Sequence, residues 1–126
     1  MQRRTSGIIR LTPAADYSAN EGKGVTISGE IATLSASATV PWDGVIVEAG
    51  TVAQGCGVAI LGATPGSVDI KVTGVIVKGA KLIQAADGTA ITDSGSGVRV
   101  QVAVANEAAV SGDLIEVFIR TPLVLA

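Results

Sequence analysis

Hydrophobic and polar residues alternate along two stretches near the end of the chain, Val98–Val104 and Leu114–Arg120. In the first stretch valines occupy every second position, and in the second the alternate positions hold two isoleucines and a valine. This period of two is expected of a β-strand that places one face on a hydrophobic core. The link between them, residues 106–113, is too short for the crossover helix that parallel strands require. The two strands are therefore predicted to pair antiparallel.

Shorter patterns of the same kind recur through the rest of the chain, separated by residues that favour turns. They predict strands over residues 8–11, 25–34, 44–49, 57–61, 68–77, 81–84 and 89–92. The last two flank Asp87-Gly88, a pair typical of a tight hairpin because glycine tolerates a positive φ. No amphipathic helix is indicated. About nine short strands predict an all-β fold, namely a single-domain antiparallel β-sandwich or barrel.

The first 24 residues are the least regular part of the chain, and Pro13 is disfavoured inside a central strand. We expect residues 1–24 to form an extended N-terminal arm ahead of a β domain over residues 25–126. The arm holds four cations and two anions, which give it a net charge of +2: Arg3, Arg4, Arg10, Lys23, Asp16 and Glu21. The rest of the chain has a net charge of −4. A basic arm can hold an acidic surface of a partner, and the alternative is a solvated, flexible tail.

Composition favours a protein that associates with other chains. At 126 residues the chain is long enough for one domain with a real core, and 48% of its residues are hydrophobic. Only Tyr17, Trp42 and Phe118 are aromatic, so this core is expected to be aliphatic. Charged residues make up just 16%, which leaves apolar surface for other copies or a partner to cover. The net charge of −2 does not favour nucleic-acid binding.

Trp42 follows Pro41 in a predicted turn over residues 41–44. In that position a tryptophan is expected to cover one end of a barrel or sandwich. The alternative is a binding-surface aromatic, because an indole ring offers both a large apolar face and a polar N–H.

The residue types present argue against an enzyme. The chain contains no histidine, which removes the commonest general base, the serine–histidine triads and most zinc sites. Its single cysteine, Cys56, lies between two glycines in an aliphatic stretch and is expected to be a small buried hydrophobe. The carboxylates are scattered at predicted turns without the spacing of a calcium loop. We therefore predict no catalytic residue, no metal site and no cofactor.

One triplet offers an enzymatic alternative. Asp93-Ser94-Gly95 has the form found in aspartic proteases, and a dimer would bring two such aspartates together to share a proton. However, the triplet is followed by Ser96-Gly97 rather than by a small apolar residue and a continuing strand. The simpler interpretation is a turn between two strands.

The beginning of the chain, residues 1–10, lacks the apolar core of a signal peptide, and no apolar stretch approaches the length of a membrane helix. We therefore expect the protein to be made and folded in a cytoplasm, with no membrane partner.

From about residue 44 to residue 119 the order of features resembles the small capsid decoration, or cement, proteins of tailed bacteriophages, a DUF2190-like family. The resemblance rests on three runs of small residues and valines: Gly57–Ile60 with Val68–Val72 and Gly74-Val75, Gly79–Leu82 leading to Asp87-Gly88, and Val100–Ala105 closing with Gly112–Val117. The chain departs from the family at Gln101, near which the family often has glycine. Residues 1–43 are not placed by the resemblance.

The resemblance implies a β-rich structural protein that assembles as a homotrimer on the outer surface of the capsid and bridges major capsid subunits. The localisation would then be the virion, after synthesis in the host cytoplasm. For the capsid contact we predict residues of the basic arm and the hydrophobic residues between them: Arg3, Arg4, Ile8, Ile9, Arg10 and Leu11. The alternative is a carbohydrate- or receptor-binding β module of a virion.

Overall fold

The computed structural model describes residues 8–63 and 67–126, and within these ranges it contains ten β-strands and no helix. The strands are β1 (Ile8–Pro13), β2 (Gly24–Ser28), β3 (Ile31–Leu34), β4 (Gly44–Glu48), β5 (Cys56–Ile60), β6 (Val68–Lys71), β7 (Lys81–Gln84), β8 (Ala90–Thr92), β9 (Arg99–Ala105) and β10 (Leu114–Leu125). The predicted all-β fold is confirmed.

The first five strands form a closed barrel in the order β1-β3-β2-β4-β5. The barrel closes where β1 pairs antiparallel with β5, from Ile8 opposite Ala59 to Leu11 opposite Cys56. On its other edge β1 pairs with β3, and this pair is parallel. The barrel encloses its own aliphatic cluster: Leu11, Tyr17, Val25, Ala32, Ile46, Cys56 and Val58. Closure leaves no free edge on β1, so this strand belongs to the fold.

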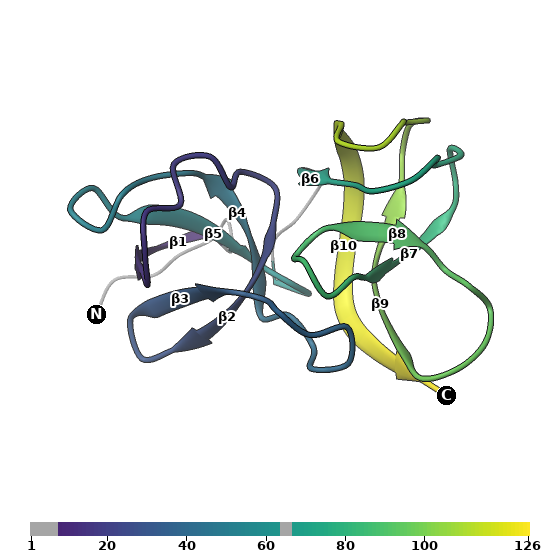
Figure 1. Cartoon of the computed structure of the whole chain (residues 1–126), viewed down its shortest axis with the longest axis horizontal. Helices are drawn as coiled ribbons and strands as arrows, with labels where there is room; N and C mark the ends of the chain where they lie inside the picture. The colour runs from purple at the N-terminus through teal and green to yellow at the C-terminus, as the bar shows by residue number, and fades with distance from the viewer. Residues whose placement is uncertain (1–7, 64–66) are drawn as a thin grey trace.

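The last five strands form a second sheet, in the order β6-β10-β9-β7-β8, which lies beside the barrel in Figure 1. Strands β9 and β10 pair antiparallel as predicted, with a break in register between Ile119 and Leu123 where β10 bends. The sheet curls because the chain after β6 returns to its far edge. There Val72 bridges to Ala90, and the Thr73 N–H donates to the Ala90 carbonyl at 2.9 Å.

The barrel and the second sheet share one hydrophobic cluster. Trp42, Val45, Ala59 and Leu61 of the barrel pack with buried residues of the second sheet, such as Val102. Because a single cluster spans both sheets, the described chain forms one folding unit.

A buried polar side chain also connects the two sheets. Gln84, at the end of β7, is only 1% exposed. Its side-chain amide donates to the carbonyls of Ser37 (2.8 Å) and Val40 (2.7 Å) and accepts from the Trp42 N–H (3.1 Å). All three contacts lie in the loop between β3 and β4, so Gln84 fixes this loop against the second sheet. Hydrogen bonding compensates the cost of burying the amide.

Ten strands form instead of about nine because the stretch predicted as one strand over residues 25–34 is a hairpin. Strands β2 and β3 pair antiparallel, with Ser28 opposite Ile31. Gly29 makes the reversal possible with a φ of 60°, a conformation that residues with a Cβ rarely adopt. The alternation continues across the turn in sequence, so the pattern alone did not indicate the break.

The predicted N-terminal arm over residues 1–24 is wrong for its described part. Residues 8–13 are a barrel strand, and Tyr17 is 7% exposed. The Tyr17 hydroxyl accepts from the Leu34 N–H at 3.1 Å, and the main-chain N–H of Tyr17 donates to the Gly50 carbonyl at 3.1 Å. The physical reason is that β5 would otherwise present an unpaired edge and the barrel cluster an open side.

Candidate functional site

The residues predicted for capsid contact do not form a free arm within the described range. Ile8 and Arg10 are exposed, Ile9 is half-buried and Leu11 is 8% exposed against the barrel core. Their main-chain groups lie in the β1–β5 pairing. They therefore cannot add a strand to a partner without opening the barrel. Arg3 and Arg4 lie outside the described residues, and the prediction for them stays open.

Arg10 is committed to neighbours in its own barrel. Its guanidinium donates to the Glu48 carboxylate at 2.8 Å and to the Gln54 carbonyl at 3.0 Å. The Glu48 carboxylate raises the pKa of Arg10, chiefly through this hydrogen bond. Both side chains are more than half exposed, so the ion pair contributes little to stability. It does hold the cation on the barrel surface.

Trp42 is buried between the two sheets and is not a surface aromatic. The residue is 1% exposed and belongs to the cluster shared by the two sheets. Its indole Nε1 is buried without a hydrogen-bond partner among the described residues. A side chain in this position cannot stack its face on a sugar ring. Tyr17 is buried as well, which leaves Phe118, at 46% exposed, as the exposed aromatic of the described chain.

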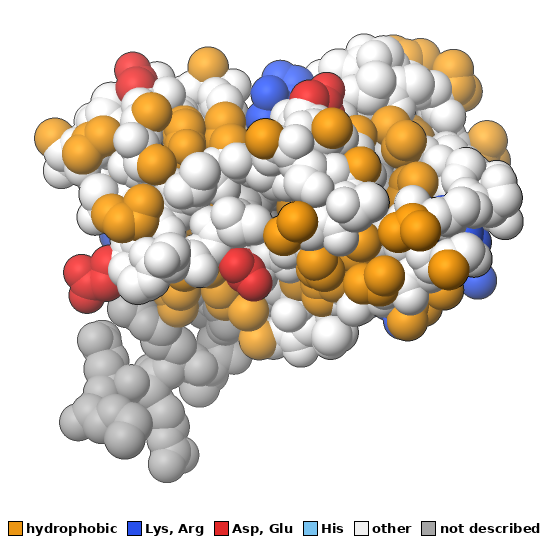
Figure 2. Space-filling view, turned by 60° about the horizontal axis from the view of Figure 1, so that its bottom comes forward, with side chains coloured by type: hydrophobic (Ala, Val, Ile, Leu, Met, Phe, Trp, Pro, Cys, Tyr) orange, Lys and Arg blue, Asp and Glu red, His pale blue; other side chains and the backbone are white. Residues whose placement is uncertain are grey.

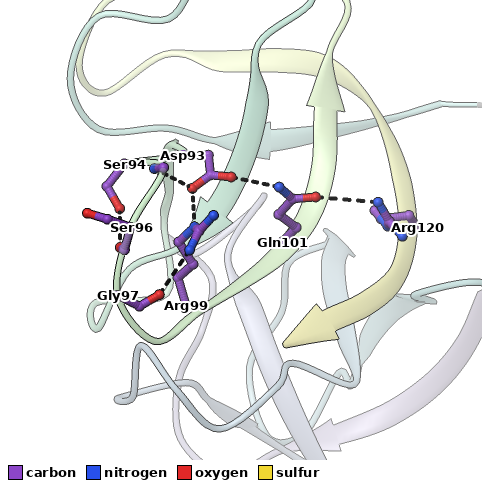
Figure 3. Close-up of polar contacts among 8 residues, drawn as sticks. Asp93, Ser94, Ser96, Gly97, Arg99, Gln101 and Arg120 are labelled. Atoms are coloured by element: carbon purple, nitrogen blue, oxygen red, sulfur yellow. Dashed lines mark hydrogen bonds and ion pairs between the residues drawn. The ribbon is translucent and has the colours of Figure 1, made fainter. Parts of the chain in front are cut away.

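Asp93 lies at one end of a polar row that runs from the loop after β8 across β9 to β10 (Figure 3). Its carboxylate accepts from the Gly95 N–H (2.9 Å), from the Gln101 side-chain amide (2.6 Å) and from the Arg99 guanidinium. The side-chain oxygen of Gln101 in turn accepts from the Arg120 guanidinium at 3.4 Å. The row thus connects the loop after β8 with β9 and β10.

This geometry does not suit shared-proton chemistry. The pKa of Asp93 is lowered, chiefly by the Gly95 N–H and further by the side chains of Gln101 and Arg99. Both oxygens of the Asp93 carboxylate already accept hydrogen bonds from their own chain, whereas two aspartates that share a proton need an oxygen free to bond a second carboxyl group. Asp93 instead caps its own turn and pairs with a cation on the neighbouring strand. The arrangement supports the turn interpretation of Asp93-Ser94-Gly95.

A hollow of about 300 Å³ lies between the barrel and the second sheet, lined by Ile8, Glu21, Val47, Ser67, Val68, Asp69 and Glu116. Glu116 is engaged there, because it accepts from Asn106 and from Ser67 (2.9 Å), and these hydrogen bonds lower its pKa.

No group of three or more metal-binding side chains occurs in the described parts of the chain. Nor do these parts hold a helix that could cross a membrane.

The most unusual feature of the surface is its apolar content. Large hydrophobic side chains are exposed on both sheets and on the loops: Ile8, Ile31, Val40, Val52, Val75, Val77, Val98, Val110, Leu114, Phe118, Leu123 and Val124. Figure 2 shows one face on which hydrophobic side chains are widespread and charged ones are few. Single exposed hydrophobics are ordinary, but contiguous ones mark interaction surfaces. We take this apolar surface as the candidate functional site.

Three of these exposed residues, Val75, Val77 and Val110, were not singled out from the sequence. Val75 and Val77 belong to a stretch predicted as one long strand over residues 68–77 with a bend or bulge at Gly74. The chain does bend at Gly74, which adopts a φ of 81°, but β6 already ends at Lys71. The signal available was the run of alternating valines after this glycine, which has no charged residue on its outer face.

The chain matches no protein-family model, and a search of curated proteins found no match.

Proposed function

We propose that this protein is a structural decoration, or cement, protein of a tailed-phage head. It binds the outer surface of the capsid as a homotrimer and stabilises the shell without catalysing a reaction. In this proposal the partner is the major capsid protein lattice, and the location is the virion after synthesis in the host cytoplasm.

The observation that carries the proposal is the exposed apolar surface on an all-β framework. Val75, Val77, Val98 and Val110 are each more than 60% exposed, although branched aliphatic residues are normally found inside. A chain with 16% charged residues offers few ionic contacts to keep such a surface solvated. When other copies and a capsid cover this area, its removal from water contributes a favourable free energy of about 25 cal/mol per Å².

The sequence resemblance supports the same function. Several of the runs that carry it fall on strands: Gly57–Ile60 lies in β5, Val68–Val72 forms β6 and the residue after it, and Val100–Ala105 lies in β9. The Asp87-Gly88 pair forms the β7–β8 hairpin, with Gly88 at a φ of 85°. The resemblance thus covers the framework of the second sheet and one barrel strand.

A decoration protein acts by mass action. Any ligand that binds the intact shell and not its separated subunits stabilises the shell, and the gain grows with the logarithm of ligand concentration over Kd. A homotrimer multiplies this effect, since three weak contacts on one particle reach an avidity well above that of one contact. The protein needs no active site for this role.

The test uses undecorated phage heads and the purified chain. We expect the protein to co-sediment with the heads and to raise the temperature at which they release packaged DNA. Failure to bind undecorated heads at any ratio would overturn the proposal. Binding to a glycan array without binding to heads would instead favour the carbohydrate-binding alternative.

A further inference from the structure

Residues 22–24, which lead into β2, connect the main chain of the barrel to that of the second sheet. The Lys71 N–H donates to the Gly22 carbonyl at 2.9 Å, and the Gly24 N–H donates to the Gly88 carbonyl at 2.8 Å. Among the described residues, these are the main-chain hydrogen bonds that cross from the barrel to the second sheet. Residues 22–24 are called the strap below.

The strap contacts the second sheet where the two outermost strands of that sheet meet. In the order β6-β10-β9-β7-β8, the outermost strands are β6 and β8. They meet just after β6, where Val72 bridges to Ala90 and the Thr73 N–H donates to the Ala90 carbonyl at 2.9 Å. This contact of residues 72–73 with residues 89–90 is called the seam. The strap bonds to residue 71 on one side of the seam and to residue 88 on the other.

The seam has few hydrogen bonds of its own. Besides the bond from the Thr73 N–H, the hydroxyl groups of Thr73 and Thr89 lie 2.8 Å apart. The Thr89 hydroxyl donates to the Asp87 carboxylate at 2.6 Å, so the Thr73 hydroxyl is the donor of the bond across the seam. A segment that bonds to both sides of this contact therefore adds substantially to what holds it together.

The barrel anchors the strap from the opposite side. The Gly22 N–H donates to the Ile46 carbonyl at 2.7 Å, and the Ile46 N–H donates to the Lys23 carbonyl at 2.9 Å. Ile46 lies on β4 and is fully buried in the barrel cluster. The strap thus joins a core strand of the barrel to both sides of the seam.

The first residue of the strap fits against the second sheet without room for a side chain. A Cβ at Gly22 would overlap the Leu114 side chain and the main-chain nitrogen of Lys71. Gly22 also has a φ of 84°, which residues with a Cβ rarely adopt. Both the backbone conformation and the close approach therefore require glycine at this position.

We propose that the strap holds the seam of the second sheet closed, so that the curl of this sheet depends on the barrel. This inference concerns a conformational device within the fold and does not rest on the proposed function. When the strap is displaced, the second sheet opens first at the seam, while β9 and β10 in its middle stay paired. The seam then exchanges its amide protons through a local opening rather than through global unfolding.

Hydrogen–deuterium exchange of the full chain, resolved for single amides by NMR, tests this inference. The Thr73 amide reports on the seam, and the Ala105 amide, which donates to the Ala80 carbonyl at 2.9 Å, reports on β9. Gly22→Ala displaces the strap through the overlap of its Cβ. The matched control is Gly95→Ala, because Gly95 has a φ of 81° but nothing within 4 Å of an added Cβ.

A second variant, Lys71→Pro, removes the N–H that donates to Gly22 and places no new side chain on the strap. Residue 71 ends β6, an outermost strand, and proline is tolerated on such strands where the N–H points away from the sheet. Far-UV circular dichroism and thermal unfolding verify that each variant is folded. If Gly22→Ala does not fold, Lys71→Pro decides the test by the same measurement.

We expect exchange at Thr73 to become about tenfold faster, relative to exchange at Ala105, in both strap variants. Gly95→Ala should leave this ratio at the wild-type value. An unchanged ratio in folded strap variants would overturn the inference, because the seam would then stay closed without the strap. Equal acceleration of both amides would overturn it too, since the seam would then open only with the whole molecule. A ratio raised as much by Gly95→Ala would also overturn it.

Discussion

At the scale of single residues, Gly24 packs against Trp42 without room for a side chain. A Cβ added at Gly24 would overlap the six-membered ring of the indole, which is itself 1% exposed. Gly24 does not adopt a positive φ, so the backbone would accept alanine. The cost of Gly24→Ala would therefore come from the ring alone. We expect a loss of about 3 kcal/mol in the free energy of unfolding, measured by urea denaturation.

Gly57→Ala is the matched comparison, since Gly57 is also a strand glycine without a positive φ. A Cβ there would meet the Cβ of the exposed Glu48 at 3.1 Å, a contact that a small shift relieves. Its loss should be clearly smaller. Equal losses for the two variants would contradict the packing argument.

The pH dependence of stability tests the role of Asp93. Because the folded-state pKa is lowered, the stabilisation is fully present above the unfolded value of about 4 and is lost as pH falls through the folded value. Asp93→Asn should therefore be less stable than the wild type at pH 7, with a difference that shrinks toward pH 3. Urea unfolding at both pH values measures it. Peptide cleavage by the wild type that the variant loses would instead support the protease alternative.

The sequence predicted the structural roles of single residues only in part. The turn interpretation of Asp93 and the burial of Cys56 followed from local chemistry, and the structure agrees. The three hydrogen bonds of Gln84 did not, because its partners lie more than 40 positions away in sequence. A buried glutamine has no local signal when its partners are main-chain groups of a distant loop.

At the scale of elements, β1 is the strand that closes the barrel. Removal of residues 1–13 would leave β5 with an unpaired edge and remove Leu11 from the core. We expect this truncation to lose on the order of 5 kcal/mol, most of the stability of a small domain, as measured by urea unfolding. Removal of residues 1–7 alone should leave the unfolding midpoint unchanged. A wild-type midpoint after removal of residues 1–13 would show that β1 is dispensable.

The shorter truncation also isolates the predicted contribution of Arg3 and Arg4. Because it spares the barrel, any loss of head binding on removal of residues 1–7 belongs to those residues themselves. Comparison at low and moderate salt separates an ionic contact from an apolar one.

Most strands could be predicted from alternation, and the exceptions have a physical cause. Strand β9 was expected to bury one face from Val98 to Val104. The structure exposes Val98 (64%) and buries Gln101 and Ala103 on the other face. Strand β9 is central, paired with β10 and β7, and on its second face the side chains of Asp93 and Arg120 bond to Gln101. Strand order is not encoded in the period of one strand, and neither is the pairing that closes the barrel.

At the scale of the whole molecule, the shared core predicts cooperative unfolding. Trp42 lies in the cluster that joins the two sheets, so its fluorescence reports their separation. Far-UV circular dichroism reports the strands of both sheets. We expect the two signals to give the same urea midpoint in a single transition. Two separate midpoints would show that the barrel and the second sheet unfold independently.

The division into a barrel and a curled sheet was not foreseeable from the sequence, which allowed a sandwich or a barrel equally. Composition did indicate that the molecule has an aliphatic core and a weakly charged surface. Which valines would remain exposed depended on how residues 72–80 lie against residues 105–113, and no local pattern specifies that contact.

The central claim is that trimers of this chain bind the outer surface of a phage head. Charge-detection mass spectrometry of undecorated heads, titrated with the purified protein, tests it most directly. The account predicts that the mass of each head rises to a plateau in increments of three 12.5 kDa chains. A head mass that stays constant in excess protein, or that rises by single chains, would contradict it.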